Sequence, residues 1–416
     1  MKKLAARPRG TVGVVDIGSS KLCCFIAHRR DGEPQIAGIG HQVSRGVKGG
    51  VIVDIEAASR SILAAIHAAE QMAGETLSEV VVNLSGGFNP SRLIKSEINV
   101  NGREITDHDM RRVLDNGHLI KEPAEREVVH SIHVGFSIDQ SRGIRDPRGM
   151  FGQRLGVNMH VVTAQQAAVR NLTQCIGRCH LEIGALVVSP YAAGLAALVE
   201  DETELGVTVV DMGAGTTGIA VFFDGNLVFT DTVPVGGGHV TNDIARGLST
   251  PLAHAERMKT LYGCAIASSA DERETITVPQ VGEEDESQAN HVPKSLLVGI
   301  ISPRLEETFE LVRDRLEHSG FDKIAGRRVV LTGGACQLPG VRELAGLILD
   351  KQIRIGRPLR IDGLAEATGG PAFATSAGLV QFALSERAET PRRGRALTEE
   401  PGGVFLRFGQ WIRENF

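Results

Sequence analysis

Two segments of the chain place an aspartate at the end of an apolar run, with a glycine-rich turn directly after it. The first segment is Asp16–Lys21 and the second is Asp211–Thr217. Glycine-rich turns after buried strands let backbone N–H groups approach phosphate oxygens, because no Cβ blocks the way. Hydroxyl groups add further donors, and Lys21 adds a positive charge. The predicted phosphate-binding residues are Gly18, Ser19, Ser20 and Lys21 in the first turn and Gly213, Ala214, Gly215, Thr216 and Thr217 in the second.

The two aspartates suit a magnesium ion that is bound largely through water. Hydrated Mg²⁺ keeps several of its waters and needs only one or two protein carboxylates. Asp16 and Asp211 each stand at the end of a predicted strand, immediately before the turn. We therefore predict that both aspartates hold Mg²⁺ beside the phosphates.

Two further glycine-rich turns fit other parts of a nucleotide. Gly333, Gly334 and Ala335 follow a strand without a carboxylate, which favours close backbone approach to an adenosine over metal binding. Gly236, Gly237 and Gly238 lie near the start of a predicted helix, where the helix dipole favours phosphate. A single turn of this kind is most often structural. All of the turns together, in this order and spacing, predict an ATP site.

The elements that position these turns repeat along the chain. Apolar runs at Thr11–Ile17 and Leu205–Met212 both lead into Asp-x-Gly, and they begin two halves of similar size. An internal duplication is the natural interpretation. Helical spacing at Ile55–Ala73 and an apolar run at Val80–Leu84 add a helix and a buried strand to the first half. The predicted fold class is α/β.

Residues 89–163 have a different pattern, typical of a separate α+β insert. Short alternating strands are predicted at Val128–Ile138 and Met159–Val162. Thr106 with Asp109 three residues later has the spacing of a capping box and marks the start of a helix. The other predicted elements are helices over 164–179, 191–198 and 296–318, strands over 21–26, 185–188 and 328–331, and an exposed acidic loop over 268–295.

Composition argues against several classes of protein. The chain has 416 residues and a formal net charge of −5, with no dense basic face, so nucleic acid is not expected as the main partner. It shows neither a secretory signal nor an apolar run long enough to span a bilayer, which predicts a cytoplasmic protein. Cys175, Cys179 and His180 are too few ligands for a good zinc site. Small buried thiols in a reducing compartment are the favoured interpretation.

The last residues form a predicted amphipathic helix. They hold the only tryptophan and three of the fourteen phenylalanines of the chain. Such a helix is about 20 Å long, too short for a hydrocarbon core of about 30 Å, so we expect it to lie in the membrane interface. The alternative is a helix docked on the protein's own core. The predicted membrane-contacting residues are Val404, Phe405, Leu406, Arg407, Phe408, Trp411, Ile412, Arg413 and Phe416.

With these motifs in place, the chain resembles the superfamily of actin, sugar kinases and heat-shock chaperone ATPases. Asp16–Lys21 and Asp211–Thr217 are similar to its two phosphate loops, and Leu331–Gly340 is similar to its adenosine loop. The resemblance implies that Glu256 and Lys259 contact the ribose and adenine. It also implies a two-lobed, duplicated ribonuclease-H-like fold whose last connecting helix is 374–384, and ATP with Mg²⁺ as cofactors.

Within the superfamily the whole chain resembles the FtsA family of bacterial cell-division proteins. The insert after Ser85 stands where that family carries a subdomain absent from actin, and the linker and tail complete the pattern. Further similar segments are 205–207, 233–237 and 301–304. The resemblance implies a protein that polymerises on the cytoplasmic face of the inner membrane at the division site. It also implies binding of the C-terminal peptide of FtsZ, with Arg304 as a basic contact, and recruitment of later division proteins.

Two departures bear on catalysis. Ser189 stands where heat-shock relatives carry a glutamate that organises hydrolysis, so at most weak ATPase activity is expected and no catalytic residue is assigned. Gln165 and Gln166 could orient a water, but surface glutamines are far more common. Ala214 replaces the middle glycine of the second loop and leaves phosphate binding feasible. The alternatives are a sugar-kinase-like phosphotransferase, a pilus-assembly or cell-shape actin homologue, and a chaperone.

The resemblance divides the chain into subdomains. The predicted subdomains are 1A (1–84, 164–199 and 365–385), the inserted 1C (85–163), 2A (200–243 and 327–364) and 2B (244–326), then a flexible linker (386–401) and the amphipathic helix (402–416).

Overall fold

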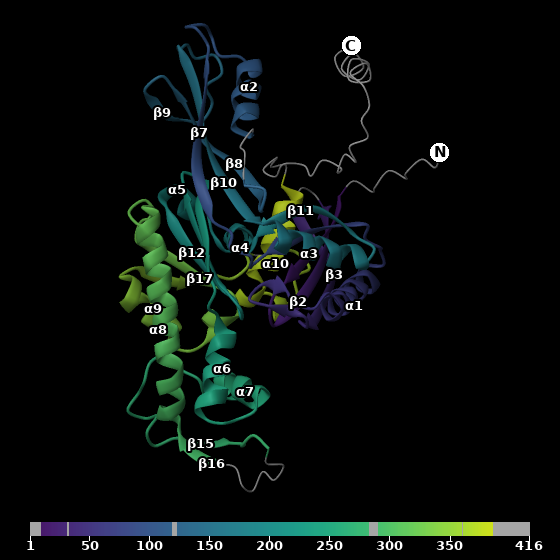
Figure 1. The fold of residues 1–416 in the computed structure, drawn as a ribbon, viewed down its shortest axis with the longest axis vertical. Coiled ribbons are helices and arrows are strands. Elements are labelled where there is room, and N and C mark those ends of the chain that lie inside the picture. Colours follow the sequence, from purple (N-terminus) through teal and green to yellow (C-terminus); the bar gives the residue numbers. More distant parts are fainter. Residues whose placement is uncertain (1–9, 31–32, 119–122, 283–289, 360, 386–416) are drawn as a thin grey trace.

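The computed structural model describes residues 10–30, 33–118, 123–282, 290–359 and 361–385. Two lobes stand side by side, each built on a five-stranded sheet. A smaller sheet with one helix extends from one end of this pair, and a mainly helical unit extends from the other end (Figure 1). The predicted linker at 386–401 and the tail residues from Val404 to Phe416 lie outside the described residues.

The first lobe has the strand order β11-β6-β1-β2-β3. β1 runs antiparallel to β2 and parallel to β6, so the first phosphate turn is the hairpin turn between β1 and β2. The strands are β1 Thr11–Ile17, β2 Lys21–Arg30, β3 Glu33–Val43, β6 Glu79–Leu84 and β11 Glu182–Val188, with the short hairpin β4 Val47–Lys48 and β5 Val51–Ile52. The helices are α1 Ile55–Ala73, α3 Gln166–Arg178, α4 Ser189–Ala197 and α10 Ala374–Leu384.

The second lobe repeats this topology in the order β14-β13-β12-β17-β18. β12 runs antiparallel to β13 and parallel to β17, as β1 does with β2 and β6. The strands are β12 Val207–Met212, β13 Thr217–Phe223, β14 Asn226–Val233, β17 Arg328–Thr332 and β18 Gln352–Ile355. The predicted duplication is therefore confirmed at the level of strand order and direction.

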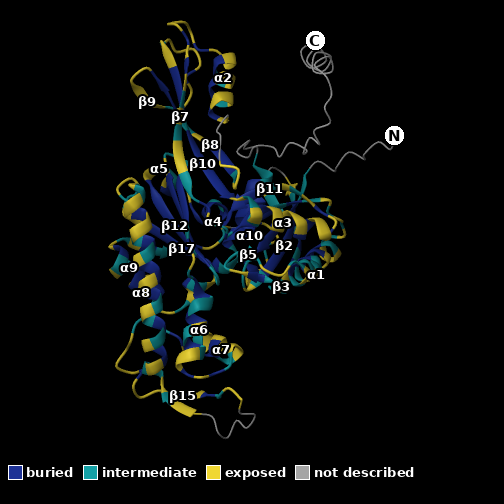
Figure 2. Cartoon of the chain, in the orientation of Figure 1, coloured by how far each residue is buried: buried dark blue, intermediate teal, exposed yellow. Residues whose placement is uncertain are grey.

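Further helices and short turns complete the second half of the chain. The helices are α5 Glu200–Leu205, α6 Gly237–Gly247, α7 Leu252–Tyr262, α8 Lys294–Ser319 and α9 Val341–Leu349, and the 3₁₀ turns are η2 Gly334–Gln337, η3 Glu366–Thr368 and η4 Pro371–Phe373. The two faces of this sheet serve different cores. Val209 and Phe222 join the core of the first lobe, whereas Val210 and Val221 join a core with α6 and α8. Figure 2 shows the strands of the lobes mostly buried and the outer side of α8 exposed.

The helix α1 shows how local sequence sets an element's bounds. Asp54 caps its start, because the side-chain Oδ1 accepts a hydrogen bond from the Ala57 N–H at 3.0 Å. Gly74 ends it in the left-handed conformation, with φ of 70°. The predicted helix at 55–73 is confirmed, and its apolar stripe packs on β2 and β3.

The insert is a four-stranded sheet in the order β7-β10-β8-β9, covered by one helix. Its elements are β7 Ser91–Asn99, α2 Asp107–His118, β8 Arg126–Ile138, β9 Ser141–Ile144 and β10 Arg154–Gln165. β10 extends well beyond the predicted strand at Met159–Val162, because it pairs along both edges with β7 and β8. The insert also contacts the second lobe: Arg145 forms ion pairs with Glu204 at 2.9 Å and Asp224 at 2.7 Å.

The prediction that residues 268–295 form an exposed loop is wrong in part. β15 Thr275–Val278 and β16 Asn290–Pro293 form an antiparallel hairpin in this segment. Ile276 and Val278 are buried in the second core. The alternation of apolar and polar residues here is too short to predict a strand. Glu283–Glu286, the acidic part of the prediction, lie outside the described residues. Within the described ranges, no helix combines the length and apolar character needed to cross a bilayer.

The predicted capping pair at the start of α2 generates a test of stability. The fully buried Asp109 carboxylate accepts hydrogen bonds from Arg103 at 2.6 Å and from the Thr106 hydroxyl at 2.7 Å and N–H at 3.1 Å. The Arg103 guanidinium, followed by Thr106, holds the pKa of Asp109 well below its ordinary value. We expect Asp109→Asn to lower the stability of the insert at neutral pH by roughly 1–2 kcal/mol. Hydrogen exchange of the α2 amides measures this loss.

The contribution of Asp109 to the stability of the insert should depend on pH. Because the folded-state pKa of Asp109 is depressed, its contribution is present above the ordinary pKa of 3.8 and is lost as the pH falls below that value. The difference between wild type and Asp109→Asn should therefore shrink in acid. Asp115→Asn, on the exposed side of the same helix, is the matched control and should change little. Equal protection of α2 in wild type and Asp109→Asn at pH 7 would contradict the prediction.

Candidate nucleotide-binding site

The two predicted phosphate turns have the same backbone closure. In the first turn the Gly18 N–H donates to the Lys21 carbonyl at 3.0 Å, and in the second the Gly213 N–H donates to the Thr216 carbonyl at 2.9 Å. The turns belong to different lobes and face each other. A methyl group added at Gly215 would collide with the Ser19 Oγ. The duplication therefore brings two equivalent hairpin turns, separated by almost two hundred positions, into direct contact.

Asp16 of the first lobe and Asp211 of the second lie close enough for their charges to interact. The Asp16 carboxylate is buried and accepts a hydrogen bond from the Ser376 hydroxyl at 2.7 Å. The Asp211 carboxylate accepts one from the Thr375 hydroxyl at 3.2 Å. Burial raises the pKa of Asp16, and burial followed by the charge of Asp16 raises the pKa of Asp211 to about 6. Two carboxylates in mutual repulsion form a donor set that fits a hydrated divalent cation.

The Gly236–Gly238 turn is hydrogen-bonded to the second phosphate turn. Its N–H groups at Gly237 and Gly238 donate to the carbonyls of Gly213 at 2.9 Å and Ala214 at 2.7 Å. The turn therefore holds the second phosphate turn in shape, and these two amides are already engaged. Direct phosphate binding by Gly236, Gly237 and Gly238 stays a prediction.

Glu256 and Lys259 of α7 meet the start of α6. The Lys259 ammonium donates to the Gly237 carbonyl at 3.1 Å, to the Thr241 hydroxyl at 2.9 Å and to the Glu256 carboxylate at 2.7 Å. The Lys259 ammonium therefore lies against the Gly236–Gly238 turn. The structure places both residues against the start of α6, and their contact with ribose and adenine, which the resemblance implies, stays a prediction.

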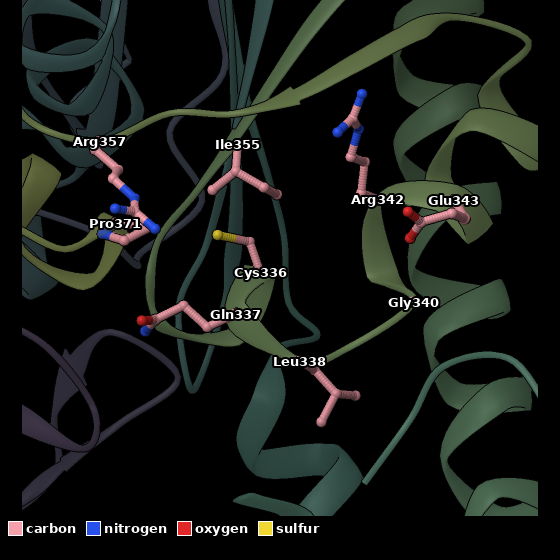
Figure 3. Close-up of a pocket in the computed structure, with 9 residues that line it drawn as sticks. All are labelled: Cys336, Gln337, Leu338, Gly340, Arg342, Glu343, Ile355, Arg357 and Pro371. Carbon is pink, nitrogen blue, oxygen red and sulfur yellow. The ribbon is translucent and has the colours of Figure 1, made fainter.

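The predicted adenosine turn continues into η2 and borders a pocket. The Gly333 N–H and the Thr332 hydroxyl both donate to the Pro371 carbonyl at 3.1 Å, which fixes the turn against η4. Beside it lies a pocket of about 330 Å³ (Figure 3). Figure 3 places Gln337 and Arg357 on one side of this pocket and Arg342 and Glu343 on the other. Its remaining lining residues are Cys336, Leu338, Gly340, Ile355 and Pro371.

Lys21 points towards η4. Its ammonium donates to the Ala372 carbonyl and lies 3.3 Å from the centroid of the Phe373 ring, a cation–π contact. The first turn is also tied to the β4–β5 hairpin, because the Gly50 N–H donates to the Ser19 hydroxyl at 3.0 Å. Ala372 and Phe373, directly before α10, therefore fix the direction of the Lys21 side chain. Its positive charge stays within the site.

Sequence reasoning missed several residues of the site. The sequence places Thr375 and Ser376 only within a connecting helix, although two adjacent hydroxyls in a mostly apolar helix are a usable signal. Asn83 was missed as well: its side chain accepts from the Ile17 N–H at 2.6 Å and donates to the Ser189 hydroxyl at 3.0 Å. Ser189, which replaces the glutamate of heat-shock relatives, is therefore buried and engaged.

Two residues considered from the sequence, the predicted FtsZ contact Arg304 and the thiol of Cys175, belong to helices and not to the glycine-rich turns. Arg304 of α8 is paired with Asp243 at 2.5 Å and with Glu307, so it is already engaged within the second lobe. The Cys175 Sγ lies 3.2 Å from the Ser59 Oγ. Across the described residues, no group of three or more His, Cys, Asp or Glu side chains is arranged to hold a metal ion.

Comparison with known proteins decides the family. The profile described as "Cell division protein FtsA" matches residues 208–378, and "SHS2 domain inserted in FTSA" matches residues 90–163. A cell division protein FtsA of Rhizobium meliloti is 46% identical over 100% of this chain and 97% of its own length. The FtsA of Escherichia coli K12 is 32% identical over 99% of this chain and 100% of its own length. The chain belongs to the FtsA family of cell-division proteins.

Solved structures bear out the actin-like fold. The chain is similar to the PilM-PilN type IV pilus biogenesis complex, with a TM-score of 0.64, 19% identity and coverage of 91% of this chain and 100% of that one. It is also similar to MreB5 of Spiroplasma citri bound to ADP, with a TM-score of 0.52, 13% identity and coverage of 90% and 96%. At these identities the likeness concerns the fold alone. Full-length identity to FtsA proteins favours that family over the sugar-kinase, pilus-assembly, cell-shape and chaperone alternatives.

The carboxylate pair of this FtsA-family chain generates a second prediction. Asp211 has an ordinary pKa of 3.8 and a folded-state pKa of about 6. Because the pKa is raised, ionisation of Asp211 costs stability as the pH rises from about 4 to about 6, and that cost stays constant above this window. We expect Asp211→Asn, without metal or nucleotide, to be more stable than wild type at pH 7–8 by about 1–3 kcal/mol. Urea denaturation in EDTA measures the difference.

The difference between the two proteins should fall towards zero near pH 4, where Asp211 is protonated in wild type as well. Glu310→Gln, an exposed carboxylate-to-amide change on α8, serves as the control and should have little effect. If Asp211→Asn were less stable than wild type at pH 8, the carboxylate pair would not be a source of repulsion.

Proposed function

We propose that this FtsA-family protein binds ATP with Mg²⁺ between its two lobes. The observation that carries the proposal is the meeting of the two duplicated turns, each with its aspartate, at one point between the lobes. Ser19 and Gly215 come from opposite lobes and lie in contact there. Phosphate groups bound at this point would receive N–H and hydroxyl donors from both lobes, so binding would favour the closed arrangement.

The residues of the site fit the parts of the ligand. Asp16 and Asp211 would hold Mg²⁺ largely through its waters, and Lys21 would face the phosphates. The adenosine would lie against Gly333, Gly334 and Ala335, with Glu256 and Lys259 near the ribose. Bound Mg²⁺ supplies positive charge that offsets both the phosphates and the carboxylate pair. Ser189 and Asn83 offer no general base, so we expect slow hydrolysis at most.

The nucleotide would control assembly, and assembly would control membrane binding. One tail helix at 402–416 gains only modest affinity for an interface, because ordering the tail and immobilising the protein offset much of its apolar burial. A filament presents many tails at once and gains from their effective concentration. We propose that such filaments hold FtsZ at the cytoplasmic face of the membrane and recruit later division proteins.

The contact with FtsZ would fall on the unit formed by α6, α7, α8 and the β15–β16 hairpin. Arg304 stands on this unit with Asp243 and Glu307 as partners, and its side chain is 29% exposed. An acidic group in the FtsZ peptide would compete with these carboxylates for the guanidinium. Arg304 is therefore proposed as a contact that exchanges one anionic partner for another.

Liposome co-sedimentation tests the link between ATP, assembly and membrane. We compare the full chain, a chain truncated after Glu400 and Gly215→Val, each with and without Mg-ATP on anionic vesicles. We expect only the full chain to pellet strongly, and only with Mg-ATP, because a side chain at Gly215 would collide with Ser19 and close the phosphate space. Equal sedimentation of the full and truncated chains would overturn the membrane role. Equal Mg-ATP-dependent sedimentation of Gly215→Val and wild type would overturn the site.

Binding of a fluorescent FtsZ C-terminal peptide tests the second surface. We expect Arg304→Ala to weaken binding about tenfold, because a charge-assisted hydrogen bond contributes about 1.5 kcal/mol or more. Arg257→Ala, an exposed arginine on α7 of the same unit, is the matched control and should bind as wild type does. Fluorescence anisotropy gives both affinities. Unchanged binding by Arg304→Ala would exclude this arginine from the contact.

A further inference from the structure

The helix α10 touches both aspartates of the site with two neighbouring residues. The Thr375 hydroxyl donates to Oδ2 of Asp211 at 3.2 Å, and the Ser376 hydroxyl donates to Oδ2 of Asp16 at 2.7 Å. Asp16 belongs to the first lobe and Asp211 to the second. A single helical turn therefore bridges the carboxylates of the two lobes, although neither residue belongs to a glycine-rich turn.

The position of this turn is fixed by close packing. Thr375 and Ser376 are both buried, and α10 lies against α4 between the two lobes (Figure 1). At Gly378, one turn further on, an added methyl group would collide with the Ala192 carbonyl oxygen, so the two helix backbones are in contact. The 3₁₀ turn η4 precedes α10 directly and carries the carbonyl of Pro371 that holds Gly333. The two hydroxyls therefore have little freedom to move.

A fixed hydroxyl determines how a carboxylate is turned. Each hydroxyl occupies one oxygen of its aspartate, and a carboxylate oxygen that accepts a good hydrogen bond holds the χ2 rotation of the side chain in place. The second oxygen is then left in a defined direction. Preorganised ligand direction is what residues behind a metal ligand supply, and their loss typically weakens metal affinity 10- to 100-fold.

We propose that Thr375 and Ser376 are positioning residues of the nucleotide site, which turn Asp211 and Asp16 towards a shared hydrated divalent cation. This inference rests on the proposed binding of Mg-ATP between the lobes. Since both hydroxyls come from one turn of one helix, the correct direction of both carboxylates requires that both lobes sit correctly against α10. The start of α10 thereby makes cation binding depend on the relative position of the lobes.

The test measures how ATP binding depends on Mg²⁺ concentration. The variants are Thr375→Val, which keeps the shape and removes the hydroxyl, Ser376→Ala, and Thr375→Ser, which keeps the hydroxyl. The matched control is Thr308→Val on α8, another buried threonine, whose hydroxyl donates to the Arg304 carbonyl at 2.8 Å. Calorimetry with ATP at a series of Mg²⁺ concentrations gives the Mg²⁺ midpoint, and the same titration in EDTA gives metal-free affinity.

We expect Thr375→Val and Ser376→Ala each to raise the Mg²⁺ midpoint about tenfold. ATP affinity in EDTA should stay within about twofold of wild type, because the hydroxyls act on the carboxylates and not on the nucleotide. Thr375→Ser should restore the wild-type midpoint, and Thr308→Val should leave it unchanged. A purely structural role would instead lower affinity equally with and without Mg²⁺.

The outcomes separate this inference from the function on which it rests. If wild type binds ATP with Mg²⁺ and both hydroxyl-deletion variants keep the wild-type midpoint, the positioning role is wrong and the proposed function stands. If wild type shows no Mg²⁺-dependent binding, the proposed function and the positioning role both fail. Because Thr375→Val could disturb folding, Ser376→Ala is the independent second variant, and unfolding midpoints without ligand identify any damaged protein.

Discussion

The close approach of two carboxylates from opposite lobes, Asp16 buried and Asp211 partly buried, is the constraint around which this structure is organised. Asp16 and Asp211 repel each other, and burial removes the water that would screen them. The arrangement persists because Ser376 and Thr375 donate hydrogen bonds to them and Lys21 places a positive charge nearby. Such a pair is unfavourable by itself, and a divalent cation, as proposed above, would offset the repulsion between the two carboxylates.

The duplication explains how a repulsive pair comes to lie at the boundary of two lobes. Each lobe repeats the same strand–turn–strand unit, and the helices α4 and α10 pack between the two sheets. The insert adds a second connection away from the site, because Arg145 contacts Glu204 and Asp224 of the second lobe. A change in the angle between the lobes would therefore be felt at both α10 and the insert.

The parts of the structure that depend on local pattern could be predicted from the sequence, and the parts that depend on distant pairing could not. An apolar run followed by Asp-x-Gly specifies a buried strand and a tight turn, so both phosphate turns were found. The β15–β16 hairpin has only two buried residues and gave no usable periodicity. The contacts of Thr375 with Asp211 and of Ser376 with Asp16 span 164 and 360 positions, which no local pattern can encode.

The place of α10 in the chain bears on how the proposed nucleotide and membrane functions would be linked. This helix contacts both carboxylates at its start, and at its end the chain continues into the linker and the predicted amphipathic helix. In the proposed function, lobe closure would fix α10, but a linker of the composition of residues 386–401 would transmit no defined orientation to the tail. The proposed coupling would therefore not pass through the linker as a rigid connection. It would pass through assembly, in which many tails reach the membrane together.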